Sequence, residues 1–327
     1  MNILFAQADF GGCGFYRILQ PAAYLQFVLH HNTKVIFRYK SENLLNYDLI
    51  VLQRQNHNGI VEAIKFLQSY NKKIIYELDD DLWNVDDCNI SKPYWTPEKV
   101  SNAEAIMRAC DAITTSTEPL ANILKQFNEK VYVIPNYIPE VTPLEKFSSP
   151  IRIGWSGSIS HKVDFTDEII AALKDIKKKY REKVELVFCG WIPDKLVGYV
   201  TFFEPVPPMQ YLYFLNELRL HIGIMPCVDI KFNESKSNLK FLEYGITKTA
   251  SVASPIYPYK NTITGETGVL LKDNSYEEWF SSIDRLIQDE SYRQFLANNA
   301  YNFVRENFLI MNNIAKFEKV YQEILNI

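Results

Sequence analysis

Short apolar runs alternate with longer amphipathic stretches along almost the whole chain, and the alternation forms two series. The first predicts strands at 2–7, 34–38, 49–52, 73–78, 112–116 and 131–135, and helices from about residue 15, at 59–70, at 97–110 and from 117. The second predicts strands at 151–155, 184–189, 200–203, 220–225, 250–253 and 269–271, and helices at 165–182, 209–219, 236–245 and near the C-terminus. Such strand–helix alternation predicts parallel sheets with helices on both faces.

A proline-rich segment separates the two series. Four prolines fall from Pro135 to Pro150, a density typical of a linker. The 327 residues exceed the roughly 250–300 at which one hydrophobic core usually stops growing. We therefore predict an α/β protein of two Rossmann-like, doubly wound domains, 1–140 and 150–305, that face a cleft. Ligands in such folds bind at the carboxyl ends of the strands.

Composition narrows the class of protein further. Apolar residues make up 47% and charged residues 23%, as in ordinary soluble proteins, and the net charge of −4 lacks the basic excess of a duplex-DNA binder. The five cysteines form no CxxC pair, so no zinc or dithiol motif is present, and scattered cysteines are typical of reduced thiols in the cytoplasm. No leader and no apolar run of about 18–20 residues is seen, so we expect a cytoplasmic protein without a transmembrane segment.

Two candidate sites lie in the first series. Gly12 and Gly14 follow the first strand, where glycines let a ligand approach the backbone and a helix N-terminus favours an anion; a tight turn is the alternative. Arg17, one turn further on, would add a charge to the cleft or lie in solvent. Asp79, Asp80 and Asp81 end another strand, and they could bind a divalent metal, contact a sugar or acceptor, or cap a helix in solvent.

Two further candidates lie in the second series. Gly157 and Ser158 follow its first strand and could expose N–H groups to a phosphate, with Lys162 supplying a charge, or form an ordinary turn. The segment FNESKSNLKFLEYG places Lys236, Lys240 and Glu243 at spacings i, i+4 and i+7, hence on one face of a helix that Ser235 or Ser237 can cap. Two lysines at a helix N-terminus suit a diphosphate, and the carboxylate suits ribose hydroxyls.

These motifs, taken in order, resemble one known family. The set GCGFYRILQP, YELDDDLW, VIPNYI, IRIGWSGSISHK and FNESKSNLKFLEYG with TASVASPIYPY is similar to family 4-like GT-B glycosyltransferases, and above all to a short bacterial and phage-associated subgroup. The resemblance covers nearly the whole chain. It implies a hexosyl or pentosyl transferase that uses a nucleoside-diphosphate sugar, such as a UDP-sugar, and whose last helix, 310–327, packs back onto the first domain.

The resemblance also implies roles for single residues. Glu243 would bind the ribose, and the N–H groups of Ser237, Asn238 and Leu239 would hold the β-phosphate. Lys162, with Lys236 or Lys240, would neutralise the leaving diphosphate, while Gly12 and Gly14 approach the donor phosphates from the other domain. Asp79 and Asp80 stand where many relatives place a histidine that contacts the donor sugar. Many relatives carry a second glutamate eight positions before the first, and this chain has Ser235 there.

The expected reaction is therefore sugar transfer to an acceptor hydroxyl, with retention of configuration and without an essential metal or other cofactor. The alternatives are a metal-dependent transferase that uses Asp79 and Asp81, and a non-catalytic nucleotide-sugar-binding subunit. The acceptor could be a glycan, a lipid-linked glycan or, in a phage enzyme of the host cytoplasm, a hydroxymethylated DNA base.

Overall fold

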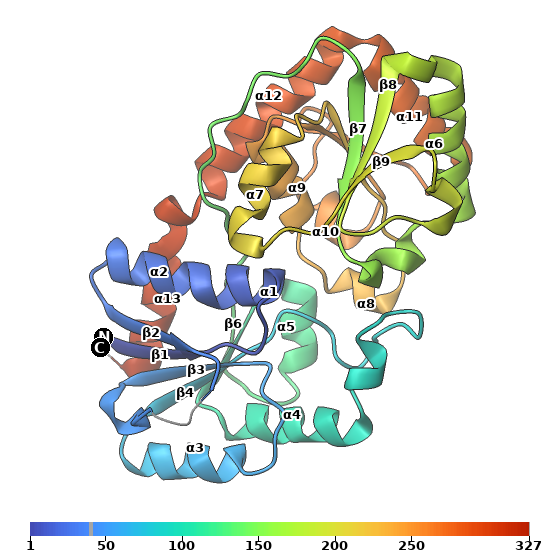
Figure 1. Cartoon of the computed structure of the whole chain (residues 1–327). Helices are drawn as coiled ribbons and strands as arrows, with labels where there is room; N and C mark the ends of the chain where they lie inside the picture. The colour runs from blue at the N-terminus through green and yellow to red at the C-terminus, as the bar shows by residue number, and fades with distance from the viewer. Residues whose placement is uncertain (39–41, 327) are drawn as a thin grey trace.

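The computed structural model describes residues 1–38 and 42–326, which form two α/β domains stacked along the long axis of the molecule (Figure 1). The N-terminal sheet is entirely parallel, in the order β2-β1-β3-β4-β5-β6. Its strands are β1 (Asn2–Ala6), β2 (Asn32–Ile36), β3 (Leu49–Gln53), β4 (Lys73–Glu77), β5 (Ala112–Thr115) and β6 (Val131–Val133). Its helices include α2 (Gln20–Phe27), α3 (Ile60–Ser69), α4 (Pro97–Ala109) and α5 (Glu118–Leu124).

The C-terminal sheet repeats this arrangement in the order β12-β11-β10-β7-β8-β9, again with parallel pairs. Its strands are β7 (Ile151–Ser156), β8 (Val184–Cys189), β9 (Val200–Phe203), β10 (Ile222–Met225), β11 (Ala250–Ala253) and β12 (Val269–Leu270). Its helices are α6 (Asp167–Tyr180), α7 (Pro208–Glu217), α8 (Lys231–Glu234), α9 (Leu239–Ile246), α10 (Tyr257–Lys260), α11 (Tyr276–Gln288) and α12 (Glu290–Asn307). Two doubly wound sheets are what the alternation in the sequence predicts.

The last helix, α13 (Ile310–Leu325), leaves the C-terminal domain and lies beside α2 of the N-terminal domain (Figure 1). Ile314, Phe317 and Tyr321 join the hydrophobic core that Phe5 of β1 contributes to. Residue 327, the last of the helix expected at 310–327, lies outside the described residues. The apolar face of α13 is therefore buried against the first domain, so the C-terminal helix packs on the N-terminal part of the chain.

The predicted elements differ from the observed ones mainly beside the cleft. The first helix starts at α1 (Gly12–Gly14), not near residue 15, and passes through a π-helical turn, Phe15–Leu19, into α2. Helix α9 starts at Leu239, three residues later than predicted, and its N-cap is Asn238 without a side-chain cap. The expected cap by Ser235 or Ser237 is therefore wrong, and Lys236 lies before the helix instead of on its face.

Candidate functional site

A cavity of about 850 Å³ lies between the two domains and is lined by residues of both. In each sheet the strand order reverses next to the domain's first strand: β1 has β2 on one side and β3 on the other, and β7 has β8 and β10. Loops that follow such strands diverge at the switch point and leave a crevice. The segments after β1 and β7 both line the cavity, so two switch points face each other across it.

Close backbone contacts fix these loops. A Cβ atom at Gly14 would lie 2.0 Å from the carbonyl oxygen of Asp9, so only glycine fits there. Gly190, which follows β8, has φ +91°, and a Cβ atom there would lie 2.5 Å from the carbonyl oxygen of Gly157. Gly157 and Gly190 thus let the loops after β7 and β8 touch at the cavity wall.

The α8–α9 connection carries the best candidate for anion binding. Lys236, Ser237, Leu239 and Lys240 line the cavity, whereas Asn238 occupies the N-cap position of α9 and its side-chain amide donates to Thr262 Oγ1. Among the hydrogen bonds of the described residues, none uses the backbone N–H groups of residues 237–239. Free N–H groups at the positive end of a helix, beside two ammonium groups, form a site for a negatively charged ligand.

Asp164, which no sequence motif marked, holds Lys236 and His161 on the side of the cavity that the C-terminal domain contributes. Its side chain is fully buried, and its Oδ1 accepts hydrogen bonds from the Asn233 amide at 2.8 Å and from Val228 N at 3.0 Å. Its Oδ2 lies 2.8 Å from His161 Nδ1 and 3.5 Å from Lys236 Nζ. Burial opposes its ionisation, but the His161 hydrogen bond and the Lys236 charge lower its pKa to about 2. Asp164 therefore stays charged and holds Lys236 at the cavity.

His161 lines the cavity as a neutral imidazole. Burial and the charge of Lys236 lower its pKa to about 4. Because Nδ1 faces the ionised Asp164, it carries the proton, which leaves Nε2 as a hydrogen-bond acceptor.

This pKa predicts a pH effect on stability. Between its ordinary value of 6.5 and about 4, the unfolded chain protonates His161 and the folded chain does not, so stability is lost as the pH falls through this window. Between pH 7.5 and 5 the wild type should lose about 1–2 kcal/mol more unfolding free energy than His161→Gln. Urea unfolding at both pH values measures this, and equal losses in the two proteins would contradict the assignment.

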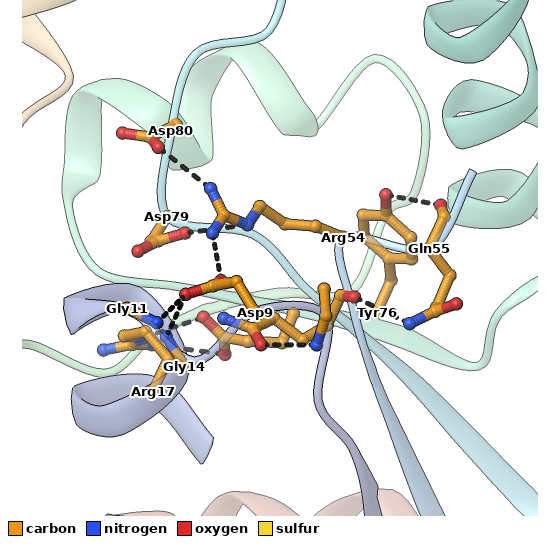
Figure 2. A network of polar contacts seen from close by, with 12 residues as sticks. Asp9, Gly11, Gly14, Arg17, Arg54, Gln55, Tyr76, Asp79 and Asp80 are labelled. Carbon is orange, nitrogen blue, oxygen red and sulfur yellow. Dashed lines mark hydrogen bonds and ion pairs between the residues drawn. The ribbon is translucent and has the colours of Figure 1, made fainter. Parts of the chain in front are cut away.

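The N-terminal domain contributes Asp79 and Asp80 to the cavity wall, and Arg54 pairs with both carboxylates (Figure 2). The guanidinium group lies 3.2 Å from Asp80 Oδ2 and 3.8 Å from Asp79 Oδ1, and it forms a short ion pair with Asp9. The other oxygen of Asp9 accepts from the N–H groups of Gly11 at 2.7 Å and Gly14 at 3.2 Å. Burial and the charge of Asp79 raise the pKa of Asp80 to about 6. One arginine thus ties the aspartates to the glycine turn after β1.

The carboxylates beside Arg54 are also those for which the sequence suggested a divalent-metal site. The Cys13 sulfur and carboxylate oxygens of Asp79 and Asp80 lie within 4.8 Å of one another, close enough for a metal ion. Burial raises the pKa of the Cys13 thiol well above its usual range, and the positive charge beside both carboxylates is supplied by Arg54. Asp81 is buried and accepts from Trp83 N and from Asn84. The structure therefore does not bring Asp79 and Asp81 together at the cavity.

Glu243, on α9, is buried at the cavity between two tyrosines. Tyr16 of the N-terminal domain donates to its Oε1 at 2.9 Å, and Tyr211 of α7 donates to its Oε2 at 3.3 Å. The pKa of Glu243 is raised, because burial outweighs the charge of Lys240 and the tyrosine hydrogen bonds, which lower it. A carboxylate has about four acceptor positions, so two remain for a ligand.

The structure thus gathers most of the candidate residues at one cavity and leaves a few outside it. Those that line it are Gly12, Asp79, Asp80, Gly157, Ser158, Lys236, Ser237, Leu239, Lys240 and Glu243. Gly14, Lys162 and Asn238 are not among the lining residues, and Lys162 is exposed. Arg17 neither reaches the cleft nor lies in solvent, because it is buried in an ion pair with Glu77. Asp164, Arg54 and Tyr211 also belong to the site but lie outside the sequence motifs, whereas Tyr16 lies within GCGFYRILQP, where only the glycines and Arg17 were predicted to act.

The fold and the two-sided cavity define the class: this is the GT-B architecture, two Rossmann-like domains around an inter-domain site. No family model matches the chain. It is similar to a protein of Methanocaldococcus jannaschii described as an uncharacterized glycosyltransferase, with 29% identity over 195 residues, or 56% of this chain. The chain spans about half of that relative, since the match covers 47% of it.

Solved structures share the fold over the full length. Sucrose-phosphate synthase from Thermosynechococcus elongatus superposes with a TM-score of 0.72, at 14% identity over 100% of this chain and 99% of that one. HepE from Anabaena, in complex with UDP and glucose, gives 0.69 at 14% identity over 98% and 99%. An α-glucosyltransferase in complex with UDP-glucose and DNA gives 0.65 at 12% identity over 98% of each chain. Within the described residues, no helix is long and apolar enough to span a membrane.

Proposed function

We propose that this protein is a glycosyltransferase that transfers a sugar from a nucleoside-diphosphate sugar, in the first place a UDP-sugar, to an acceptor hydroxyl. One observation carries the proposal: unused backbone N–H groups and two lysines face Asp79 and Asp80 across a single inter-domain cavity. The cationic side suits a diphosphate, and carboxylates suit the hydroxyls of a sugar ring. The glycosyltransferase relative supports sugar transfer, and the UDP complex of HepE supports UDP as the nucleotide of the donor.

The residues suggest how such a reaction would run. Lys236 and Lys240 stabilise the negative charge that develops on the departing diphosphate, and this needs no metal. Glu243 binds the ribose, and Asp79 and Asp80 orient the sugar. We infer retention of the anomeric configuration from the resemblance to family 4-like enzymes, and we propose that the chain belongs to their bacterial and phage-associated subgroup. Closure of the two domains would exclude water and limit hydrolysis of the donor.

For the acceptor we propose a neutral glycan or lipid-linked glycan. The wall that the N-terminal domain contributes carries Asp79 and Asp80, with Asp9 behind them, and this charge repels a polyanion. A DNA acceptor is the second candidate, because one structural neighbour was solved with UDP-glucose and DNA. Salt separates the two: transfer to DNA falls steeply with ionic strength, whereas transfer to a neutral glycan changes little.

The proposal predicts the outcome of a donor panel. UDP-, GDP-, ADP- and CDP-sugars are tested by thermal shift and by release of the nucleoside diphosphate, each with Mn²⁺ and with EDTA. One nucleotide series, UDP first, should stabilise the fold by roughly 2.7 kcal/mol at 100 times its Kd, equally in EDTA. Stabilisation that requires Mn²⁺ would favour a metal-dependent transferase. Binding without turnover would favour a nucleotide-sugar-binding subunit, and no binding would contradict the proposal.

A further inference from the structure

A buried hydrogen-bonded chain runs from the interior of the N-terminal domain to the α8–α9 connection of the C-terminal domain. It begins at Arg17, whose Nε and Nη2 bind the two oxygens of Glu77 at 2.8 and 3.2 Å. Nη1 of Arg17 donates to Ile134 O at 2.6 Å and to Asn136 Oδ1 at 3.0 Å. Asn136 Nδ2 then donates to Ser237 Oγ across the domain boundary at 2.8 Å. Glu77, Arg17 and Asn136 are all more than nine-tenths buried.

Chemistry fixes the direction of every bond in this chain. A guanidinium group has only donors, so the oxygen of the Asn136 amide must face Arg17. Its NH₂ group must therefore face Ser237, and the usual ambiguity between amide oxygen and nitrogen does not arise. Ser237 Oγ is thereby an acceptor, and its own proton is left to be donated elsewhere. Among the described residues no hydrogen bond uses that proton, and Ser237 lines the cavity.

A second bond holds the same connection from the N-terminal domain. The Thr117 hydroxyl donates to Ser235 O at 2.8 Å, while its oxygen accepts from Leu120 N at the start of α5. Thr117 and Ser235 are both buried. Residues 235 and 237 are therefore both held across the boundary, directly beside the unused N–H groups of residues 237–239. Since these bonds join two domains, they break when the domains separate.

We propose that the Ser237 hydroxyl donates to the β-phosphate of the bound nucleotide, and that Asn136, oriented by Arg17, is the positioning residue that directs it. This inference rests on the proposed donor class. It makes affinity for the β-phosphate depend on the closed arrangement of the domains, because the donor proton is directed only while Asn136 touches Ser237. Arg17, which the sequence suggested as a cleft charge, then acts on the donor through two intermediate side chains.

The test compares a nucleoside diphosphate with its monophosphate. Kd values for UDP and UMP are measured by calorimetry for wild type, Ser237→Ala, Asn136→Ala and the double variant. Each single variant should weaken UDP binding about 10-fold, as expected for a lost hydrogen bond to a charged group, and leave UMP binding nearly unchanged. The double variant should be no weaker than Ser237→Ala, because both changes remove the same bond.

The matched control is Asn128→Ala, which removes an amide that bonds to Met107 O and Cys110 O away from the cavity. It should lower the melting temperature and leave the ratio of the two Kd values unchanged. If wild type binds UDP but the ratio survives in Ser237→Ala and Asn136→Ala, or their losses simply add, the positioning role is wrong. If wild type binds none of UDP, GDP, ADP and CDP, the proposed donor class fails, and this inference fails with it.

Discussion

Replacing Lys236 by methionine is expected to lower kcat/KM for donor cleavage about 10²–10³-fold, the range seen when one preorganised group that stabilises developing charge is removed. Lys236 lies at the cavity with 21% of its side chain exposed, and the fully buried Asp164 holds it by an ion pair. Methionine keeps an unbranched apolar stem, one atom shorter than that of lysine, but removes the charge that a departing diphosphate would need. The loss should therefore appear in turnover more than in folding.

The measurement is release of the nucleoside diphosphate from the donor sugar, with unfolding followed in parallel. Lys125→Met, on an exposed lysine at the end of α5, is the matched control and should leave both readouts near wild type. Lys162→Met should have a much smaller effect than Lys236→Met, since Lys162 is exposed and does not line the cavity. Equal losses at Lys162 and Lys236 would instead return the leaving-group role to Lys162, as the resemblance implies.

The central strands of both sheets could be predicted from the sequence because they are buried on both faces. β3, with the sequence LIVLQ, is buried at every position, and β8 and β9 have the bounds that the apolar runs predict. Central strands of parallel sheets form near-continuous apolar runs, which local sequence shows directly. Placing a ligand cavity at the ends of β1 and β7 required only the general rule for doubly wound sheets, and the segments after both strands do line the cavity.

The start of α9 could not be predicted in the same way. Serines and lysines before an apolar run are typical of a capped helix, and this pattern suggested a start at Lys236. In the structure the Ser237 hydroxyl bonds to Asn136 of the other domain, and the Ser235 carbonyl bonds to Thr117. Contacts between domains thus determine the conformation of this segment, and local propensity does not contain them.

The ion pairs of the site could not be predicted from the sequence for the same reason. Arg54 lies in a segment without a motif, at φ +45°, yet it pairs with Asp9, Asp79 and Asp80 from two other loops. Asp164 belongs to none of the sequence motifs, and the structure shows it bonded to residues 64 and 69 positions away. Which carboxylate meets which cation depends on the packing of distant loops, so the sequence predicted Asp79 and Asp80 but not Asp9, Asp164 or the cations that pair with them.

Replacing Glu243 by glutamine should remove the ability of the protein to distinguish ribose from dideoxyribose. Tyr16 and Tyr211 occupy one acceptor position on each carboxylate oxygen, and two positions remain for the 2′ and 3′ hydroxyls of a ribose. Wild type should therefore bind UDP about 10–100-fold more tightly than 2′,3′-dideoxy-UDP, because hydrogen bonds to a charged acceptor contribute roughly 1.5–3 kcal/mol. In Glu243→Gln one oxygen becomes an NH₂ donor and the charge is lost, so the ratio should fall to within a few-fold of one.

This prediction is tested by calorimetric Kd values for UDP and 2′,3′-dideoxy-UDP, measured with the wild type and with Glu243→Gln. A merely structural role for Glu243 would weaken UDP and dideoxy-UDP equally and leave their ratio intact. The matched control is Glu234→Gln, an exposed glutamate of α8 nine positions earlier, which does not line the cavity. This change should leave both affinities unchanged. Because the Tyr16 hydroxyl reaches Glu243 from the opposite domain, a collapsed ratio would also place the ribose where the two domains meet.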